Sequence, residues 1–271
     1  MKKYKDIFNI KDKTVIINGG LGTIGNEVSQ IFLYHGAKII IFDKDEKKSK
    51  VFLKRNKLKK NKIQIYNINT SEISSLEFIQ KKILKKIKVN VFVNCSYPRD
   101  NQWIKNSFEN IKYNSLIKNI ELNANNFLWL PKIIGSHMIE KKIKGSIIQI
   151  GSIYGSRGQN MNLYNNTNVK NNFTYPFVKG GLINMTKQMA SYYAKYNIRV
   201  NCISPGGLKN KIAGSKSKQD KNFEKKYLFS NPIKRMAKPI DIAFAALFFS
   251  LDNSSYITGV NLPVDGGRLS V

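Results

Sequence analysis

Apolar runs and amphipathic stretches alternate along this chain from one end to the other. Short runs rich in Val, Ile and Phe predict strands, and longer stretches with apolar residues every three or four positions predict helices. The predicted strands are 14–18, 38–42, 63–66, 90–94, 146–150, 198–203 and 260–264, and the predicted helices are 23–34, a basic helix after residue 43, 72–87, 115–140, 175–196 and 239–251. Continuous apolar strands separated by helices are typical of a parallel sheet covered on both faces. The sequence therefore predicts an α/β fold with a doubly wound parallel β-sheet, whose ligand lies at the carboxyl ends of the strands.

No linker or internal repeat interrupts this alternation, so we expect residues 1–271 to form a single domain. Two segments, 152–174 and 207–230, are polar and lack periodicity. We expect both to be loops on the substrate side of the domain.

The net charge raises the question of a nucleic-acid partner. The 271 residues carry a formal net charge of +29 and include 40 Lys, 6 Arg, 36 Ile and 32 Asn. Lys, Asn and Ile share A/T-rich codons, so a biased genome produces this composition without selection for binding. The densest clusters, 47–62 and 81–88, fall on predicted surface helices, and Arg, the better ligand for phosphates and bases, is scarce. We expect a solvated basic face and no specific nucleic-acid partner, with weak polyanion binding as a by-product.

The cysteines and the apolar runs bear on the compartment. The two cysteines each lie inside an apolar run, which excludes a disulfide framework and favours a reducing compartment. No apolar stretch reaches the roughly 18 residues of a membrane span, and the basic start has no apolar segment behind it. We expect a cytoplasmic protein without a membrane partner.

A glycine-rich turn lies between the first predicted strand and the first predicted helix, with the sequence Gly19-Gly20-Leu21-Gly22-Thr23-Ile24-Gly25. Glycine allows close approach of the backbone to a pyrophosphate, and the helix N-terminus offers free N–H groups. Asp43 ends the second strand, where a carboxylate accepts both hydroxyls of an adenosine ribose and repels a 2′-phosphate. The pattern favours NAD and leaves NADP open, because Lys44 softens the repulsion. The alternative is that Asp43 is only a turn or cap residue.

Tyr175 and Lys179 lie four residues apart on a predicted helix, about one turn from each other. Such pairs arise by chance in this composition, and Tyr34 with Lys38 is another. Tyr175 differs because it opens a helix after the fifth strand, whose carboxyl end delivers Ser152. A nearby ammonium lowers the pKa of a phenol, which is otherwise about 10. We expect Tyr175 to act as general acid/base on an alcohol–carbonyl pair, with Ser152 on the substrate oxygen and a nicotinamide carrying the hydride.

These motifs occur in the order seen in short-chain dehydrogenases/reductases, which the chain resembles from about residue 12 to 267. The resemblance is carried by the glycine turn, Asp43, Asn94, Asn123, Ser152, Tyr175-x-x-x-Lys179, Pro205-Gly206 and Val264-Asp265-Gly266-Gly267. It implies a Rossmann-like fold and an NAD(P)-dependent oxidoreductase. It also implies a homodimer or homotetramer formed by apolar faces of the helices at 115–140 and 175–196, although core packing explains those faces almost as well.

The resemblance assigns roles to individual residues. It implies a catalytic tetrad of Asn123, Ser152, Tyr175 and Lys179. In that family the Lys also binds the nicotinamide ribose, and the Asn helps to hold a water of a proton relay. The implied cofactor-binding residues are Gly19, Gly22, Thr23, Ile24, Gly25, Asp43, Asn67, Ile68, Asn94, Ser96, Tyr175, Lys179, Pro205 and Gly206.

The sequence departs from the family pattern near the cofactor. The spacing Gly19-x-x-Gly22-x-x-Gly25 is similar to that of extended members of the superfamily, and Asn18 stands where Thr is usual. The motif after the fourth strand is Asn94-Cys95-Ser96-Tyr97, of which the first Asn carries over, and Asn67 replaces the usual adenine-contacting Asp. These departures concern individual contacts more than the cofactor itself.

The segment between Ser152 and Tyr175 is longer than is usual in the family. Together with Tyr97-Pro98-Arg99 and Lys179-Gly180-Gly181, it resembles the branch linked to flagellin modification and legionaminic-acid-type sugar biosynthesis. That resemblance implies a sugar or nucleotide-sugar substrate. The polar loop is expected over the active site, where Arg99 or Arg157 meets a phosphate or carboxylate. A solvent-facing, Asn-rich insertion explains the segment equally well.

Other chemistries find little support. His35 and His137 both lie within helix patterns, so neither a His-dependent triad nor a metal site is expected. The competing hypothesis is a non-catalytic Rossmann protein that binds a dinucleotide or RNA. Retention of all four catalytic residue types favours the enzyme.

Overall fold

Seven strands form one sheet, in the order β3-β2-β1-β4-β5-β6-β7. The computed structural model describes residues 8–209 and 220–271. The strands are β1 (Thr14–Asn18), β2 (Lys38–Asp43), β3 (Ile63–Asn67), β4 (Val91–Asn94), β5 (Ser146–Ile150), β6 (Arg199–Pro205) and β7 (Asn261–Val264). Every neighbouring pair runs parallel. The strand order reverses between β1 and β4, so the sheet is doubly wound and its crevice lies at that point.

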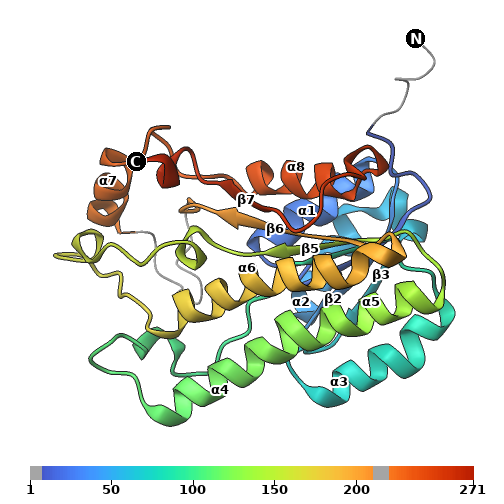
Figure 1. The fold of residues 1–271 in the computed structure, drawn as a ribbon, viewed down its shortest axis with the longest axis horizontal. Coiled ribbons are helices and arrows are strands. Elements are labelled where there is room, and N and C mark those ends of the chain that lie inside the picture. Colours follow the sequence, from blue (N-terminus) through green and yellow to red (C-terminus); the bar gives the residue numbers. More distant parts are fainter. Residues whose placement is uncertain (1–7, 210–219) are drawn as a thin grey trace.

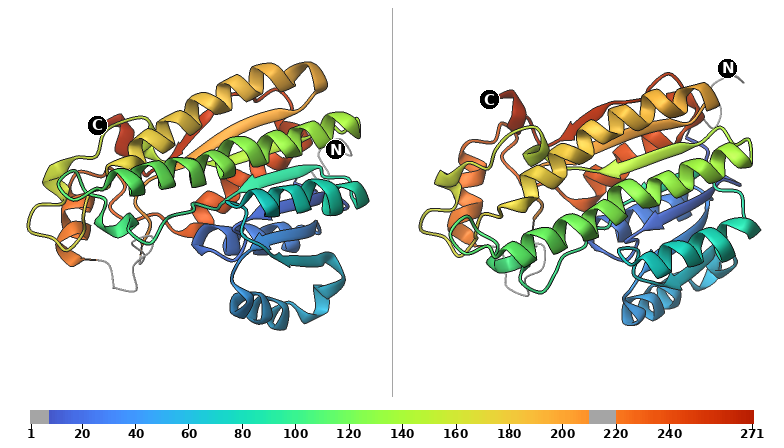
Figure 2. Two further views of the ribbon diagram at one scale, coloured as in Figure 1. Left: turned by 90° about the horizontal axis from the view of Figure 1, so that it is seen from below. Right: turned by 60° about the horizontal axis from the view of Figure 1, so that its bottom comes forward.

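Helices cover both faces of the sheet (Figures 1 and 2). They are α1 (Thr23–Tyr34), α2 (Glu46–Arg55), α3 (Ile73–Phe78), α4 (Tyr113–Ala124), α5 (Leu130–Glu140), α6 (Thr174–Tyr193), α7 (Lys221–Phe229) and α8 (Pro239–Ser250). Helices α1, α2 and α8 pack on one face, and α3, α5 and α6 pack on the other. Neighbouring residues of a strand point to opposite faces, so Ile17 joins the first core and Ile16 the second. The predicted α/β, Rossmann-like fold is confirmed.

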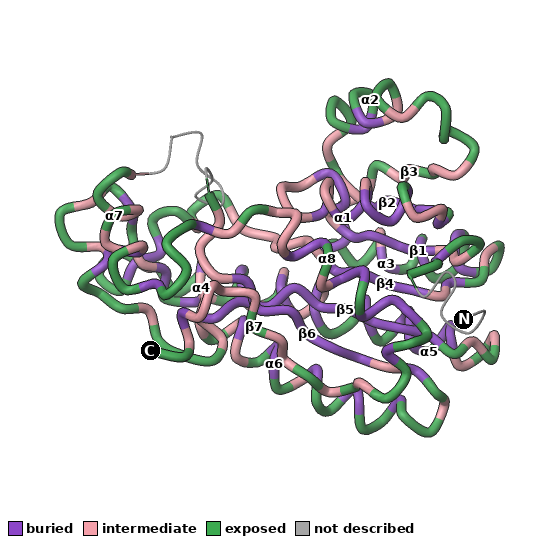
Figure 3. Tube along the Cα trace, turned by 90° about the horizontal axis from the view of Figure 1, so that it is seen from above, coloured by how far each residue is buried: buried purple, intermediate pink, exposed green. Residues whose placement is uncertain are grey.

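The central strands are buried, as the continuous apolar runs require. Strands β1, β4, β5 and β6 are buried almost throughout, whereas β3, at the edge of the sheet, is partly exposed (Figure 3). A parallel sheet covered by helices on both faces leaves no solvent-facing side, which explains why its strands read as apolar runs rather than as alternation.

The long helix predicted over 115–140 is α4 and α5, joined by a π-helical turn at Asn125–Trp129. Pro131, near the start of α5, has no N–H to donate to the preceding turn. Two carbonyls of the π-turn accept from the sheet instead. The Asn126 carbonyl accepts from Asn94 Nδ2 at 2.8 Å, and the Phe127 carbonyl accepts from Gln149 Nε2 at 3.0 Å. The helix irregularity therefore ties the helix to the ends of β4 and β5.

The predicted loop at 207–230 is wrong for its second part, because residues 221–229 form α7. Asp220 caps this helix by accepting from the N–H groups of Asn222 and Phe223. The buried Tyr227 anchors it, and its hydroxyl accepts from the Gly207 N–H at 2.7 Å. Residues 210–219 of the predicted loop lie outside the described part of the chain. The loop predicted at 152–174 is confirmed, with two short 3₁₀ turns in it.

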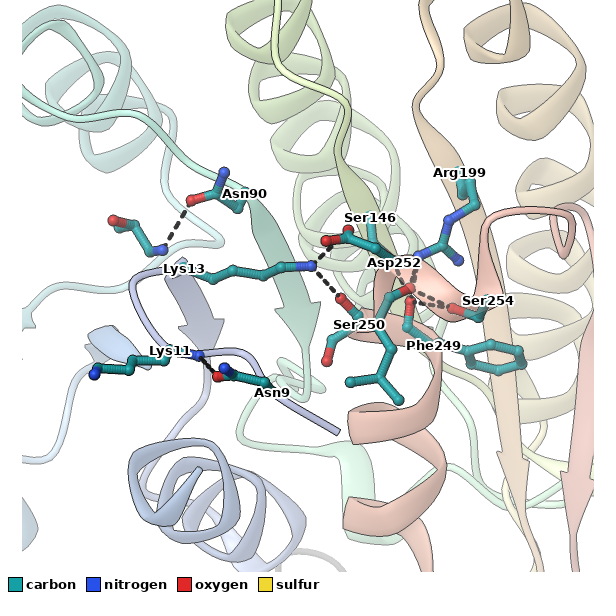
Figure 4. Close-up of polar contacts among 12 residues, drawn as sticks. Asn9, Lys11, Lys13, Asn90, Ser146, Arg199, Phe249, Ser250, Asp252 and Ser254 are labelled. Atoms are coloured by element: carbon teal, nitrogen blue, oxygen red, sulfur yellow. Dashed lines mark hydrogen bonds and ion pairs between the residues drawn. The ribbon is translucent and has the colours of Figure 1, made fainter. Parts of the chain in front are cut away.

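Polar contacts at the amino ends of the strands serve the fold (Figure 4). The last carbonyls of α8 lack hydrogen-bond donors within the helix, and two positively charged side chains donate to them instead. Lys13 Nζ donates to the Ser250 carbonyl at 3.1 Å and pairs with Asp252 at 2.7 Å. Arg199 Nη2 donates to the carbonyls of Phe249 at 2.7 Å and Leu251 at 3.0 Å. These hydrogen bonds and this ion pair therefore join the amino ends of the strands to the end of α8 and stabilise the fold.

The basic helices present their lysines to solvent. Among the residues of α2 only Ser49 and Phe52 are buried, which agrees with the expected solvated face. Within residues 8–209 and 220–271, no helix combines the length and hydrophobicity that crossing a bilayer requires.

Candidate active site

A cleft of about 1330 Å³ runs along the carboxyl ends of the strands. Segments that follow β1, β2, β4, β5 and β6 line it, and the loop at 152–174 adds one wall. The glycine turn lies at one part of this cleft and Tyr175 at another. The sheet thereby brings together residues that are more than 150 positions apart in the sequence.

The glycine turn is built for close backbone contacts. Gly19 has φ +68°, and a Cβ there would lie 2.9 Å from the backbone of Ser96. A Cβ on Gly25 would lie 2.0 Å from the Gly19 carbonyl oxygen, so this glycine packs α1 against the turn. Gly22 is the N-cap of α1 and no side chain caps the helix, while Thr23 and Ile24 line the cleft. Uncapped N–H groups that open into a cleft fit a dinucleotide pyrophosphate.

Asp43 lines the cleft and is held in place by backbone N–H groups. Its Oδ2 accepts from Leu21 at 2.9 Å and its Oδ1 accepts from Asp45 at 3.1 Å. Each carboxylate oxygen retains a second lone pair for a ribose hydroxyl. Lys44 and Lys47 also line this part of the cleft, so the local field is not purely negative.

Several predicted cofactor residues do not line the cleft. Asn67 turns its amide to Ser49 Oγ, 2.7 Å away. Asn94 is fully buried, and its Oδ1 accepts from Asn18 Nδ2 at 3.0 Å. Asn126 extends this network, because its Oδ1 accepts from Asn18 at 2.8 Å and its Nδ2 donates to the Ser96 carbonyl at 3.1 Å. Asn94 and Asn126 therefore position the cleft wall from behind. The remaining predicted cofactor residues that line the cleft are Ile68, Ser96, Pro205 and Gly206.

Sequence reasoning missed the role of Asn126. Its only signal was a position three residues after Asn123, in a segment read as an ordinary helix. The π-turn that directs it toward β1 and β4 has no clear pattern in the sequence.

Three of the four predicted catalytic side chains converge on the cleft. Ser152 follows β5 and accepts from the Tyr154 N–H at 3.1 Å, and its hydroxyl hydrogen-bonds Tyr175. Lys179 is buried, and its Nζ donates to the Ile150 carbonyl at 2.7 Å. The same Nζ lies 5.8 Å from the centre of the Tyr175 ring and 4.6 Å from that of Phe127.

Burial controls the protonation of the pair. It raises the pKa of Tyr175, and the hydrogen bond from Ser152 and the charge of Arg99 oppose that rise. Burial also lowers the pKa of Lys179 to about 7. The expectation that the Lys179 ammonium lowers the pKa of Tyr175 is therefore not met in this structure. The physical reason is that Lys179 donates to Ile150 and lies over aromatic rings, in surroundings that desolvate both groups.

Asn123 lies behind the cleft wall rather than on it. Its Nδ2 donates to the carbonyls of Asn119 at 2.7 Å and Pro98 at 3.3 Å. Its Oδ1 is buried and finds no hydrogen-bond partner among the described residues. A buried acceptor without a partner is uncommon and calls for a small donor such as water.

The loop at 152–174 lines one side of the cleft, with Tyr154, Gln159, Tyr164 and Asn172 on its lining. The hydroxyls of Tyr164 and Tyr154 hydrogen-bond each other, and the Tyr154 ring lies 6.5 Å from the Tyr175 ring. Arg157 is engaged elsewhere, since its Nη1 donates to the Arg268 carbonyl at 3.2 Å. Part of the loop therefore lines the cleft that also contains Ser152 and Tyr175.

Comparisons with known proteins agree with this geometry. A family model described as enoyl-(acyl carrier protein) reductase matches residues 20–268. A 3-oxoacyl-[acyl-carrier-protein] reductase of Chlamydia pneumoniae is 30% identical over 260 residues, covering 94% of this chain and 96% of that protein. The post-translational flagellin modification protein A of Campylobacter coli is 26% identical over 260 residues, covering 95% and 98%.

Solved structures show the same architecture. A short chain dehydrogenase of Leptospira borgpetersenii with bound NAD+ has a TM-score of 0.80 and 28% identity, covering 96% of this chain and 94% of that one. A gluconate 5-dehydrogenase of Burkholderia cenocepacia, in complex with NADP and tartrate, has a TM-score of 0.84 at 20% identity, covering 98% of each chain. At that identity the second likeness concerns the fold alone. The chain belongs to the short-chain dehydrogenase/reductase family and is an NAD(P)-dependent oxidoreductase.

Proposed function

We propose that the protein transfers a hydride between its nicotinamide cofactor and a secondary alcohol or ketone of a hydroxylated, sugar-like substrate. One observation carries the proposal: the hydrogen-bonded pair of Tyr175 and Ser152 lines the same cleft as the uncapped N-terminus of α1. This shared lining supports a proton-transfer group and a pyrophosphate site that act on ligands in one cleft.

Each catalytic side chain has a distinct role in this proposal. The bound nicotinamide supplies the hydride donor or acceptor. Tyr175 exchanges a proton with the substrate oxygen at its hydroxyl, and Ser152 orients that oxygen by a hydrogen bond. Lys179, held at the end of β5 by the Ile150 carbonyl, contributes its ammonium to the cofactor ribose. Asn123 supplies its buried Oδ1 as an acceptor for a relay water.

The cofactor preference is part of the proposal. Asp43 is oriented by two backbone N–H groups toward the part of the cleft where an adenosine ribose would lie, which supports NAD over NADP. The two neighbouring lysines reduce the margin, so we expect measurable use of NADP.

The substrate class rests on the loop at 152–174. Its hydroxyl and amide groups on the cleft lining, from Tyr154, Gln159 and Tyr164, suit a polyhydroxylated ligand. The relative named as a post-translational flagellin modification protein agrees with the family branch that the sequence resembles. The relatives named as 3-oxoacyl reductases make an acyl thioester the comparison substrate in any assay.

We also propose a homodimer or homotetramer that acts in the cytoplasm. Large apolar side chains are exposed on α4 and α6, among them Tyr113, Ile117, Phe177 and Tyr192. Two helices that carry exposed apolar residues are suited to pack on a second copy. The two free cysteines support a reducing compartment.

The Tyr175→Phe variant tests the catalytic proposal. Loss of a positioned acid/base lowers kcat by about 10²- to 10⁴-fold, while cofactor binding persists. The measurement is nicotinamide absorbance at 340 nm with a panel of sugars and acyl thioesters. Tyr34→Phe, which removes the hydroxyl of an exposed tyrosine that does not line the cleft, is the control. Equal activity of the Tyr175→Phe variant and the wild type would refute the assignment.

A further inference from the structure

Arg99 stands out among the arginines of the described chain because one nitrogen of its guanidinium is buried without a polar partner. It lies in the segment after β4, lines the cleft, and is half-buried. Its Nη1 is inaccessible to solvent and forms no hydrogen bond, and no ion pair of Arg99 exists within residues 8–209 and 220–271. By contrast, Arg199 and Arg268 satisfy their guanidinium groups with backbone carbonyls. A desolvated guanidinium nitrogen without a partner is costly unless a ligand completes it.

The guanidinium is nevertheless held in a defined position. Its Cζ lies 4.9 Å from the centre of the Trp103 ring, a cation–π contact that holds the guanidinium and uses none of its N–H donors. The adjacent carboxylate of Asp100 is occupied elsewhere. Its Oδ1 accepts from the Gln102 N–H at 3.2 Å, and its Oδ2 accepts from Ser115 Oγ at 2.6 Å. Arg99 is therefore oriented by Trp103 and is not neutralised by the acid beside it.

Arg99 is also close to the proposed reaction centre. Its charge opposes the rise in the pKa of Tyr175, and the Tyr97 ring lies 5.2 Å from the Tyr175 ring. An anion bound to Arg99 would thus share the substrate end of the cleft with an oxygen bound to Tyr175.

We propose that Arg99 binds an oxyanion of the substrate, a carboxylate or a phosphate, so that the enzyme acts on an acidic hydroxy compound rather than on a neutral alcohol. The inference rests on the proposed function, because it takes this part of the cleft as the substrate site. Planar N–H groups on one edge of a guanidinium match the oxygens of either group. Arg99 thereby selects for charge and fixes which hydroxyl faces Tyr175.

Binding is measured through Trp103, the ring that contacts Arg99. The chain has two tryptophans, so a Trp129→Phe background leaves Trp103 as the sole reporter. The protein is saturated with NAD and titrated with D-gluconate, D-glucose 6-phosphate or neutral sorbitol. We expect one of the two anions to change the fluorescence saturably and to bind at least tenfold more tightly than sorbitol. Which anion does so distinguishes a carboxylate from a phosphate.

Substitutions then locate the site. Arg99→Gln is expected to weaken the anion at least tenfold and to leave the affinity for NAD within twofold. Arg99→Lys keeps the charge without the planar edge and should lie between the two, which controls for a folding defect. Lys105→Gln removes one positive charge from a neighbouring exposed position that does not line the cleft, and we expect less than a threefold change.

Three results would overturn the proposal. The first is an affinity for the anion that is the same in the wild type and in Arg99→Gln, and the second is that neither anion binds more tightly than sorbitol. The third is that Arg99→Gln loses as much affinity for NAD as for the anion, which would assign the guanidinium to the cofactor. The titration needs no turnover. Failure of the proposed function would instead appear as full activity of Tyr175→Phe.

Discussion

Substitution of Gly25 by Ala tests how α1 is joined to the glycine turn. The added Cβ would lie 2.0 Å from the Gly19 carbonyl oxygen, 2.8 Å from the Gly19 carbonyl carbon and 2.8 Å from Gly20 Cα. All three atoms belong to the backbone, so no rotamer change relieves the contact. The Cβ contact must lengthen beyond 3.0 Å, the distance below which real Cβ contacts essentially do not occur, and α1 must therefore shift away from the turn.

The magnitude follows from the competing effects. Overpacking a well-packed site costs about 1–3 kcal/mol, and a clash with rigid backbone places this substitution near 3 kcal/mol. Ala favours a helix over Gly by about 1 kcal/mol, which leaves a net loss of about 2 kcal/mol in the free energy of unfolding. For a chain of this size each kcal/mol lowers the Tm by roughly 2–4 °C, so we expect a fall of roughly 4–8 °C.

The same shift moves the N–H groups at the start of α1 away from a bound pyrophosphate. A hydrogen bond to a charged group contributes about 1.5–3 kcal/mol, so we expect the Kd for NADH to rise at least tenfold. Calorimetric unfolding and a fluorescence titration with NADH measure the two effects. Gly158→Ala is the control, because a Cβ there meets nothing within 4 Å. A Gly25→Ala variant whose Tm and NADH affinity match those of the control would refute the packing argument.

Two further predictions concern charge. In Asp43→Asn the carboxylate that would face the ribose is gone, so we expect the ratio of kcat/KM for NADP to that for NAD to rise at least tenfold; an unchanged ratio in steady-state assays would contradict the role of Asp43. Burial lowers the pKa of Lys179 from its usual 10.5 to about 7, so between pH 7 and 10.5 the unfolded chain binds more protons and stability rises with pH. We expect Lys179→Met to be inactive and to be more stable than the wild type at pH 7 by on the order of 2 kcal/mol in the free energy of unfolding. This advantage, measured by urea unfolding, should shrink as the pH rises toward 10. A stability difference that does not vary with pH would count against a buried ammonium.

Elements that depend on local pattern were predicted well. Helix α1 and strand β5 begin and end at the predicted residues, because the apolar period and the flanking glycines are both clear there. Helix α7 was missed because its Lys-rich segment looks like a solvated loop. Its stability comes from Tyr227, which packs under a loop and accepts a hydrogen bond from Gly207, and from the Asp220 cap.

The site was predicted in part. The order of Ser152 after β5 and Tyr175 at the start of α6 places both at one edge of a parallel sheet, so their meeting follows from chain topology. The placement of Asn67 does not follow, since its turn toward Ser49 depends on where α2 packs. The choice between Arg99 and Arg157 as a ligand for an anion is of the same kind, because it depends on which guanidinium already has partners.

The order of apolar runs and glycines by itself determined the doubly wound sheet, the edge at which ligands bind and the identity of the residues delivered there, because these depend on periodicity and chain direction. Only the tertiary structure decided the protonation of Tyr175 and Lys179, the network around Asn126 and the unpaired state of Arg99. Desolvation and hydrogen-bond completion depend on everything that surrounds a group, and those surroundings come from segments far away in the sequence.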